Sequence, residues 1–167
     1  MEAKKRYKKP DAIRQLEDEM FEIKKLKYRD NPYLVKHQYT DKTANGLTRA
    51  IIDFVKLRGG QAERISTTGR PIDRRQTYTD VVGMRRTIGS IEWIKGTSTK
   101  GSADISATIA GRSVKIEVKI LADRQSEAQK QYQADIENAG GLYYIAKDFT
   151  SFVEWYYQTF GKGSNNG

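Results

Sequence analysis

The sequence predicts an α/β fold with a central mixed β-sheet flanked by helices and an N-terminal helical extension. Two observations carry this prediction. Apolar residues three or four positions apart recur in four segments, as in amphipathic helices, and short alternating or apolar runs that indicate strands lie between them. The resulting order, two helices, several strands, a helix, a strand and a last helix, is typical of mixed α/β layer architectures.

The N-terminal part is basic and then helical. Helical spacing over 11–28 predicts an amphipathic helix with Asp11 as its N-cap. Pro32 disfavours helical structure at the residue before it and so separates this helix from the next segment of the chain. The chain is expected to divide into a basic arm and helix over 1–40, a domain over 41–160 and a flexible tail over 161–167.

The domain has recognisable starts and stops for each element. The expected elements are a helix over 43–57, a strand over 61–66, a long loop over 67–84, a strand over 85–94, a β-hairpin over 101–120, a helix starting at 126, a buried strand over 142–146 and a last helix over 150–160. Ser126 and Gln129 have the spacing of a capping box. A loop as long as 67–84 is usually functional or mobile in a compact domain.

Composition narrows the function classes. The formal net charge of +9 attracts polyanions, of which nucleic acid is the commonest in a cell, although a basic protein that binds ribosomes or acidic proteins has the same charge. The absence of cysteine excludes disulfides and thiolate metal sites. No run is apolar enough for a membrane span, and no apolar segment follows the basic N-terminus, so we expect a cytoplasmic protein without a secretory signal.

The segment 101–120 places charged residues in a defined pattern. Side chains alternate along a strand, so the apolar residues of each strand share one face. A two-residue turn at Gly111-Arg112 would bury both apolar sets together. Asp104 then lies on the same face as Glu117 and Lys119, opposite Lys119 and diagonal to Glu117, within about 5–8 Å at the Cβ atoms.

This arrangement has two interpretations. Two neighbouring carboxylates are ionised together most easily with a cation between them, and hard oxygen ligands suit Mg²⁺ or Mn²⁺. With an adjacent ammonium group, such a metal site could hydrolyse phosphodiesters. The alternative is an ordinary polar face of a half-exposed hairpin, where carboxylates pair with lysine across the strands and hold no metal.

A larger set of motifs resembles a known family. The motif GSAD, then EVK about a dozen residues later, then a helix with glutamine in its first turn, then GG and YYIA, resembles the PD-(D/E)XK nuclease superfamily. Within it, the chain is most similar to the VRR-NUC and Holliday-junction-resolvase-like branch common in phages. The resemblance covers about residues 43–155 and implies a restriction-endonuclease-like core.

The resemblance assigns roles to individual residues. It implies that Asp104, preceded here by Ala103 instead of the family's proline, and Glu117 bind the metal, with Lys119 as the catalytic lysine. The carbonyl of Val118 would be a further metal ligand. Gln129 matches a glutamine that faces the site or the DNA in this branch, although its capping-box position explains it equally well.

One departure concerns the first helix of the domain. The family usually carries a glutamate there, near the metal, whereas this chain has Ala44, Asn45 and Gly46. Asn45 could reach the metal through water. Otherwise the site would bind metal more weakly or be inactive.

Other residues have two interpretations each. Basic residues near the long loop and the strand after it are candidates for phosphate contacts, or form a solvated basic face; they are Arg64, Arg70, Arg74, Arg75, Lys95 and Lys100. His37, the single histidine, lies outside the core region and argues against a histidine mechanism. The aromatic residues near the C-terminus are expected to pack in the core: Tyr143, Tyr144, Phe149, Phe152, Trp155 and Tyr156.

The sequence therefore predicts a Mg²⁺- or Mn²⁺-dependent DNA endonuclease. Phosphate contacts carry no sequence information, so we expect selection of branched or single-stranded DNA by shape, and a symmetric homodimer if the substrate is a four-way junction. The alternatives are a catalytically inactive nucleic-acid-binding protein on the same fold and an assembly protein with an acidic partner.

Overall fold

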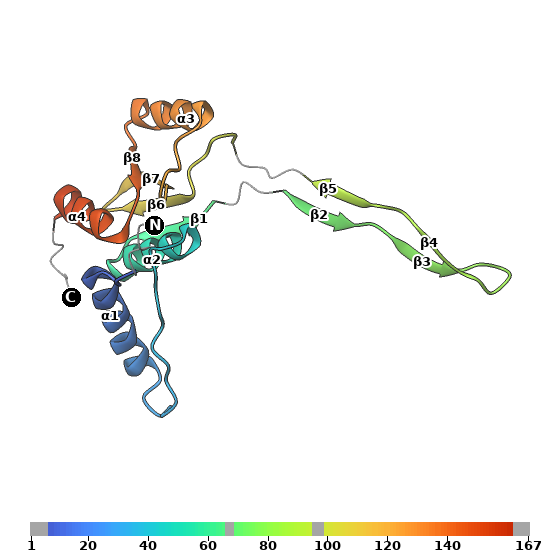
Figure 1. Ribbon diagram of the computed structural model, residues 1–167, viewed down its shortest axis with the longest axis horizontal. Coiled ribbons are helices and arrows are strands. Elements are labelled where there is room, and N and C mark those ends of the chain that lie inside the picture. The colour runs from blue at the N-terminus through green and yellow to red at the C-terminus, as the bar shows by residue number, and fades with distance from the viewer. Residues whose placement is uncertain (1–6, 66–68, 95–98, 162–167) are drawn as a thin grey trace, which may run out of the picture.

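The computed structural model describes residues 7–65, 69–94 and 99–161 (Figure 1). It contains the helices α1 (Asp11–Lys27), α2 (Ala44–Leu57), α3 (Glu127–Asn138) and α4 (Phe149–Phe160). Its strands are β1 (Gln61–Arg64), β2 (Arg70–Asp73), β3 (Gln76–Thr79), β4 (Arg85–Ile88), β5 (Ile91–Ile94), β6 (Ile105–Ile109), β7 (Arg112–Val118) and β8 (Leu142–Ala146). The expected tail beyond 161 and the first six residues lie outside the described residues.

The central sheet is mixed, as predicted, and has the strand order β1-β6-β7-β8. β6 pairs antiparallel with both β1 and β7, and β8 adds parallel to β7 after the crossover through α3. A parallel pair needs such a crossover, which the helix between the two strands supplies. The predicted α/β class with a mixed sheet and flanking helices is therefore confirmed at this level.

One face of the sheet forms the hydrophobic core. The apolar side chains of β6 and β7 point to this face and pack against α2, while α4 packs on β8 and α2. α1 packs on α2 and α4 in turn. α3 lies on the other side of the sheet (Figure 1). The fully buried members of the core include Ile13, Leu47, Ile51, Ile105, Ile109, Val114, Ile116, Phe149 and Phe152. Each of these core-facing helices therefore has one buried stripe, as its apolar spacing predicts.

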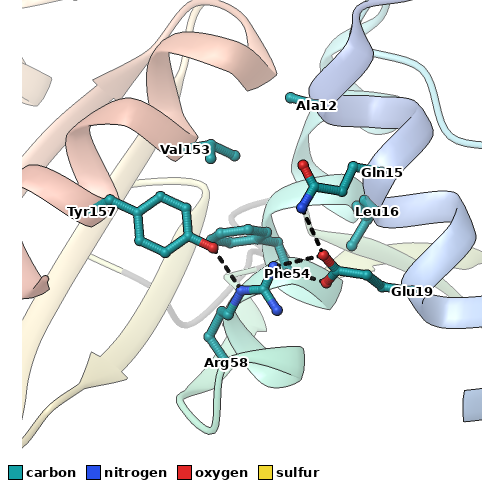
Figure 2. A pocket seen from close by; sticks show the side chains of 8 residues that line it. All are labelled: Ala12, Gln15, Leu16, Glu19, Phe54, Arg58, Val153 and Tyr157. Atoms are coloured by element: carbon teal, nitrogen blue, oxygen red, sulfur yellow. Dashed lines mark hydrogen bonds and ion pairs between the residues drawn. The ribbon is translucent and has the colours of Figure 1, made fainter. Parts of the chain in front are cut away.

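We call the central sheet and the four helices the body of the protein. The N-terminal helix α1 is fixed to the rest of the body by polar as well as apolar contacts. Arg58, just after α2, donates hydrogen bonds to Glu19 of α1 and, over 3.0 Å, to the hydroxyl of Tyr157 of α4 (Figure 2). Its guanidinium also lies over the Phe54 ring, 5.0 Å from the centroid. The helix starts one residue earlier than predicted, because Pro10 is the N-cap and Asp11 is the first helical residue.

The segment 70–94 differs from the prediction of a long loop and one strand. β2 pairs with β5 and β3 with β4, both antiparallel, and together they form a two-stranded ribbon that extends away from the body (Figure 1). Gly89 divides the predicted strand 85–94 in two, at a position where φ is +94° and a Cβ atom would lie 2.5 Å from the Arg74 carbonyl oxygen. We call residues 70–94 the arm.

The hairpin over β6 and β7 turns one residue earlier than predicted. Ile109 pairs with Arg112, so the central residues of the turn are Ala110 and Gly111. Both have positive φ, +49° and +78°, as a type I′ turn requires, whereas a type II′ turn at Gly111-Arg112 was expected. The register is consequently shifted by two residues, which leaves every side chain on its predicted face.

Candidate active site

The polar face of the sheet gathers the predicted site residues. Glu117 near the end of β7 and Lys119 just after it alternate with Ile116 and Val118, which lie in the core. The prediction that Asp104 shares their face is supported by its charge, which acts on Glu117. α3 covers this face, and its Gln129 reaches down to the strand.

Asp104 lies at the level of Glu117. Ile105 pairs with Ile116, so the same register places Asp104 opposite Glu117, and the predicted position opposite Lys119 is wrong because the turn comes one residue earlier. The Asp104 Oδ2 atom accepts a hydrogen bond of 2.9 Å from the Val118 N–H. This contact fixes the carboxylate beside the strand that carries Glu117.

Glu117 is a buried carboxylate with one oxygen unpaired. Its exposed fraction is 2%, and its Oε1 atom accepts from Gln129 and lies 3.2 Å from the Lys119 ammonium. The Oε2 atom is buried and has no hydrogen-bond partner in the described part of the chain. Burial raises the pKa of Glu117, and the charge of Asp104 raises this pKa further, against the lowering by Lys119.

The ammonium group of Lys119 lies between two carboxylates. Its Nζ atom lies 3.2 Å from Glu117 and 3.3 Å from Asp123, and the residue is 8% exposed. Burial alone would lower the pKa of Lys119, but the hydrogen bonds and charges of Glu117 and Asp123 outweigh burial and raise it. The ammonium group is therefore charged and held at the carboxylate. Nothing in the sequence pattern singled out Asp123.

Gln129 has both of the roles that its position allowed. Its Oε1 atom accepts from the Ser126 N–H and completes the predicted capping box, which the structure confirms. Its Nε2 atom donates to Glu117. The cap therefore orients the amide that holds the carboxylate, so one side chain links the start of α3 to the site.

Tyr143 belongs to this face and was missed. Tyr143 lies on β8 and pairs with Lys115 of β7. Its ring lies 6.4 Å from that of Tyr132 on α3, and its hydroxyl is buried without a described hydrogen-bond partner. Burial and the charge of Glu117 raise the pKa of Tyr143. The prediction that Tyr143 packs in the core is therefore wrong. The other five aromatic residues lie in or against the core as predicted. Alternation along the strand, with Tyr144 in the core, was the available signal.

The first turn of α2 contributes no side-chain hydrogen bond or ion pair to the site in the described structure. Asn45 is exposed, and no hydrogen bond joins it to Asp104 or Glu117. At Gly46 a Cβ atom would lie 2.3 Å from the Thr40 carbonyl oxygen, so close packing against the Thr40 backbone explains the glycine. No residue of this turn therefore takes the place of the glutamate that the family pattern has here.

The predicted phosphate-binding residues are spread over the body and the arm. Arg64 ends β1 and Lys100 precedes Gly101 on the approach to β6, while Lys95 lies outside the described residues. Arg70, Arg74 and Arg75 lie on the arm, where paired strands replace the predicted long loop, and their assignment as phosphate-binding residues stays a prediction. All the described members of the set are exposed.

The donor set fits a hard divalent cation with few protein ligands. Among the described residues, no group of three or more histidine, cysteine, aspartate or glutamate side chains could hold a metal ion. Asp104 and Glu117 nevertheless supply two carboxyl groups, and the Glu117 Oε2 atom is buried and lacks a hydrogen-bond partner among the described residues. Mg²⁺ commonly binds through one or two carboxylates and retains waters, so two carboxylates suffice.

No known protein-family model matches this chain, and no curated protein matches it. The family resemblance therefore depends on the motifs of the sequence. In the ranges that the structure describes, every helix is too short or too polar to cross a bilayer.

Gly101 offers a test of how α3 is positioned. A Cβ atom at Gly101 would lie 2.4 Å from the Ala128 carbonyl oxygen, and φ is +81°. We expect Gly101→Ala to displace the start of α3, to withdraw Gln129 from Glu117, and to lower the free energy of unfolding. The control is Gly59→Ala, where φ is +80° but no atom lies within 4 Å.

Urea denaturation separates the two effects. Gly59→Ala should cost about 1 kcal/mol, the strain of a positive φ, and Gly101→Ala about 1–3 kcal/mol more, because its added methyl group meets backbone. Equal costs for the two variants would contradict close packing of α3 on Gly101.

Proposed function

We propose that the protein is a metal-dependent DNA endonuclease with a restriction-endonuclease-like core. The observation that carries the proposal is the Glu117 carboxylate: 2% exposed, held by Lys119 and Gln129, close enough to Asp104 for that charge to raise its pKa, and left with one unpaired oxygen. Such a group is costly to the fold and is typical of sites with a catalytic or metal-binding role.

Asp104 and Glu117 would hold Mg²⁺ or Mn²⁺, with the Val118 carbonyl as a further candidate ligand. When bound, the ion would polarise a phosphate oxygen and supply hydroxide at neutral pH. The chain's own contribution is preorganisation. Val118 N–H fixes Asp104, Gln129 and Lys119 fix Glu117, and α3 shields the group from water.

Lys119 is the candidate for the residue that assists the attacking water and stabilises developing negative charge. Its ammonium lies at Glu117 and also faces Asp123, so it is available to orient a water molecule or to offset charge that develops on the phosphate. The net charge of +9 favours binding to DNA. Selection of junctions, flaps or single-stranded ends, and a symmetric dimer for junctions, remain parts of the proposal.

The second candidate is a nucleic-acid-binding protein without catalytic activity on the same fold. The observation that favours it is the first turn of α2, from which no acidic side chain reaches the site. With two carboxylates instead of three, metal affinity would be lower, and binding without hydrolysis would result if the metal is not retained.

A cleavage assay tests the proposal. End-labelled four-way junction, flap, single-stranded and plain duplex DNA are each incubated with the protein and Mg²⁺, Mn²⁺ or EDTA. We expect cutting with either metal and none in EDTA, and faster cutting of at least one branched or single-stranded substrate than of duplex. Binding without cutting in both metals would support the second candidate instead.

A further inference from the structure

In the described structure, the strands of the arm pack on one another and not on the central sheet or the helices. Its strands pair with each other, and Figure 1 shows the ribbon extending away from the sheet and helices. All its side chains are exposed except Ile72 and Asp80, which are half-buried. It also carries many of the exposed large apolar residues of the described chain: Tyr78, Val81, Val82, Met84, Ile88, Ile91, Trp93 and Ile94. An isolated two-stranded ribbon is marginally stable in water, so a partner is expected to cover it.

The dimensions of the arm match a groove of duplex DNA. Arg70 lies opposite Ile94 and Thr79 opposite Arg85, and the same register holds in β2–β5 and in β3–β4; between the two pairs the Arg74 N–H donates to the Ser90 carbonyl. The ten residues from Arg70 to Thr79 span about 33 Å. This length is about one turn of B-form DNA, whose major groove admits a two-stranded β-ribbon.

The charges of the arm suit a polyanion. Each of its three carboxylates is paired within the arm: Glu92 with Arg74 at 2.6 Å, Asp73 with Arg75 at 2.7 Å, and Asp80 with Arg86. The remaining two arginines, Arg70 and Arg85, make no ion pair with any described residue. No carboxylate of the arm is left unpaired to repel phosphate, and two guanidinium groups remain available for it.

The outer half of the arm has one face without acidic or large apolar side chains. Thr77 and Thr87 are directly opposite and share a hydrogen bond of 3.1 Å, and Thr79 is opposite Arg85 in the next position towards the tip. These four residues form the threonine face. Hydroxyl and guanidinium groups are the donors that contact phosphates and base edges.

The tip is apolar and strongly exposed. Val81, Val82 and Met84 are 104%, 74% and 62% exposed, and Arg85 and Arg86 come directly after them. Apolar side chains at such positions in DNA-bending proteins insert between base steps, at a cost of a few kcal/mol of stacking for each step. At the branch point of a junction or in a single-stranded flap, the continuous stacking of a duplex is interrupted, so this cost is reduced.

We propose that the arm is a DNA-binding ribbon whose threonine face lies along a groove and whose apolar tip recognises unstacked bases. The inference deepens the proposed function and depends on it for the identity of the polyanion. Arg70 and Arg85 bind phosphates on plain and branched DNA alike. Val81, Val82 and Met84 give branched DNA its advantage over plain duplex.

The test measures equilibrium binding in EDTA, where no cleavage occurs, to a labelled four-way junction and to a plain duplex over a range of salt concentrations. Arg85→Glu is compared with Arg112→Glu, which makes the same change of net charge at the exposed turn of β6 and β7. The tip variant Val81→Ser/Val82→Ser/Met84→Ser is compared with Val35→Ser, an exposed valine of the body. Thermal melting establishes that each variant is folded.

We expect Arg85→Glu to weaken binding to both DNAs about tenfold and to lower the salt slope by about one, while Arg112→Glu binds like the wild type. The tip variant should lose the preference for the junction and retain its affinity for duplex. Equal binding by Arg85→Glu and Arg112→Glu would overturn the inference. So would a tip variant that dissociates a dimer in sedimentation while its DNA affinity is unchanged, because the arm would then bind a second copy of the chain.

The two proposals fail in different ways. Arm-dependent DNA binding by a protein that cuts no substrate with Mg²⁺ or Mn²⁺ would leave the inference standing and remove the nuclease. If the arm variants bind DNA with wild-type affinity and still cleave it, the nuclease proposal stands and the inference about the arm is wrong.

Discussion

Glu117→Gln is expected to lower the rate of DNA cleavage by about a thousandfold, which corresponds to about 4 kcal/mol of transition-state stabilisation. Glutamine has the same size, and its oxygen can still accept from Gln129 and Lys119, so the fold is retained. The substitution removes the negative charge and the unpaired anionic Oε2 that a divalent ion would need. The measurement is single-turnover cleavage with Mn²⁺ of whichever substrate the wild type cuts fastest.

The matched control is Glu137→Gln. Glu137 is exposed on α3, and among the described residues its carboxylate accepts a hydrogen bond only from Gln133 of the same helix, so this variant should cut at the wild-type rate. If the Glu117 variant retained more than about a tenth of the activity, Glu117 could not be a metal ligand of the nuclease.

Asp104→Asn is expected to stabilise the metal-free protein while it abolishes cleavage. Asparagine can still accept from the Val118 N–H, but it removes the charge that raises the pKa of Glu117. A carboxyl group whose pKa is higher in the folded than in the unfolded chain holds its proton more tightly when folded. Its ionisation therefore lowers the free energy of unfolding as the pH rises from its ordinary pKa of 4.5 through the raised value.

The pH dependence identifies the cause. With EDTA present, the melting temperatures of wild type and Asp104→Asn should differ least below pH 4.5. As the pH rises towards 7, the melting temperature of the variant should exceed that of the wild type by a growing difference. Asp135→Asn, at an exposed carboxylate of α3, serves as the control and should melt like the wild type at every pH. A variant less stable than the wild type at pH 7 would show that Asp104 supports the fold and does not strain it.

Strand alternation predicted which face each site residue occupies, but it could not predict the register. A shift of two residues keeps Ile105 and Ile116 in the core and Glu117 outside, so the apolar pattern is satisfied by both registers. The observed turn places Ala110 at positive φ, which is unfavourable for a residue with a Cβ atom, and turn preferences therefore pointed to the wrong position.

The arm was not predictable because neither of its faces packs on the body. Tyr78 and Ile88 lie on the same face as Arg86, while Trp93 and Ile91 lie on the same face as Asp73, so no alternation of apolar and polar residues marks the strands. Gly69, Pro71 and Gly83 added signals of a loop over 67–84. Gln129 shows a third kind of limit: its cap and its contact with Glu117 are compatible, and only the folded α3 shows that both occur.

The central claim is that Asp104 and Glu117 together bind a divalent cation. Calorimetric titration of the metal-free protein with Mn²⁺ tests this directly, beside Asp104→Asn and Asp135→Asn. The account predicts one saturable site in the wild type and in Asp135→Asn, and its loss in Asp104→Asn. Mn²⁺ binding that is unchanged in Asp104→Asn, or absent from the wild type, would contradict it.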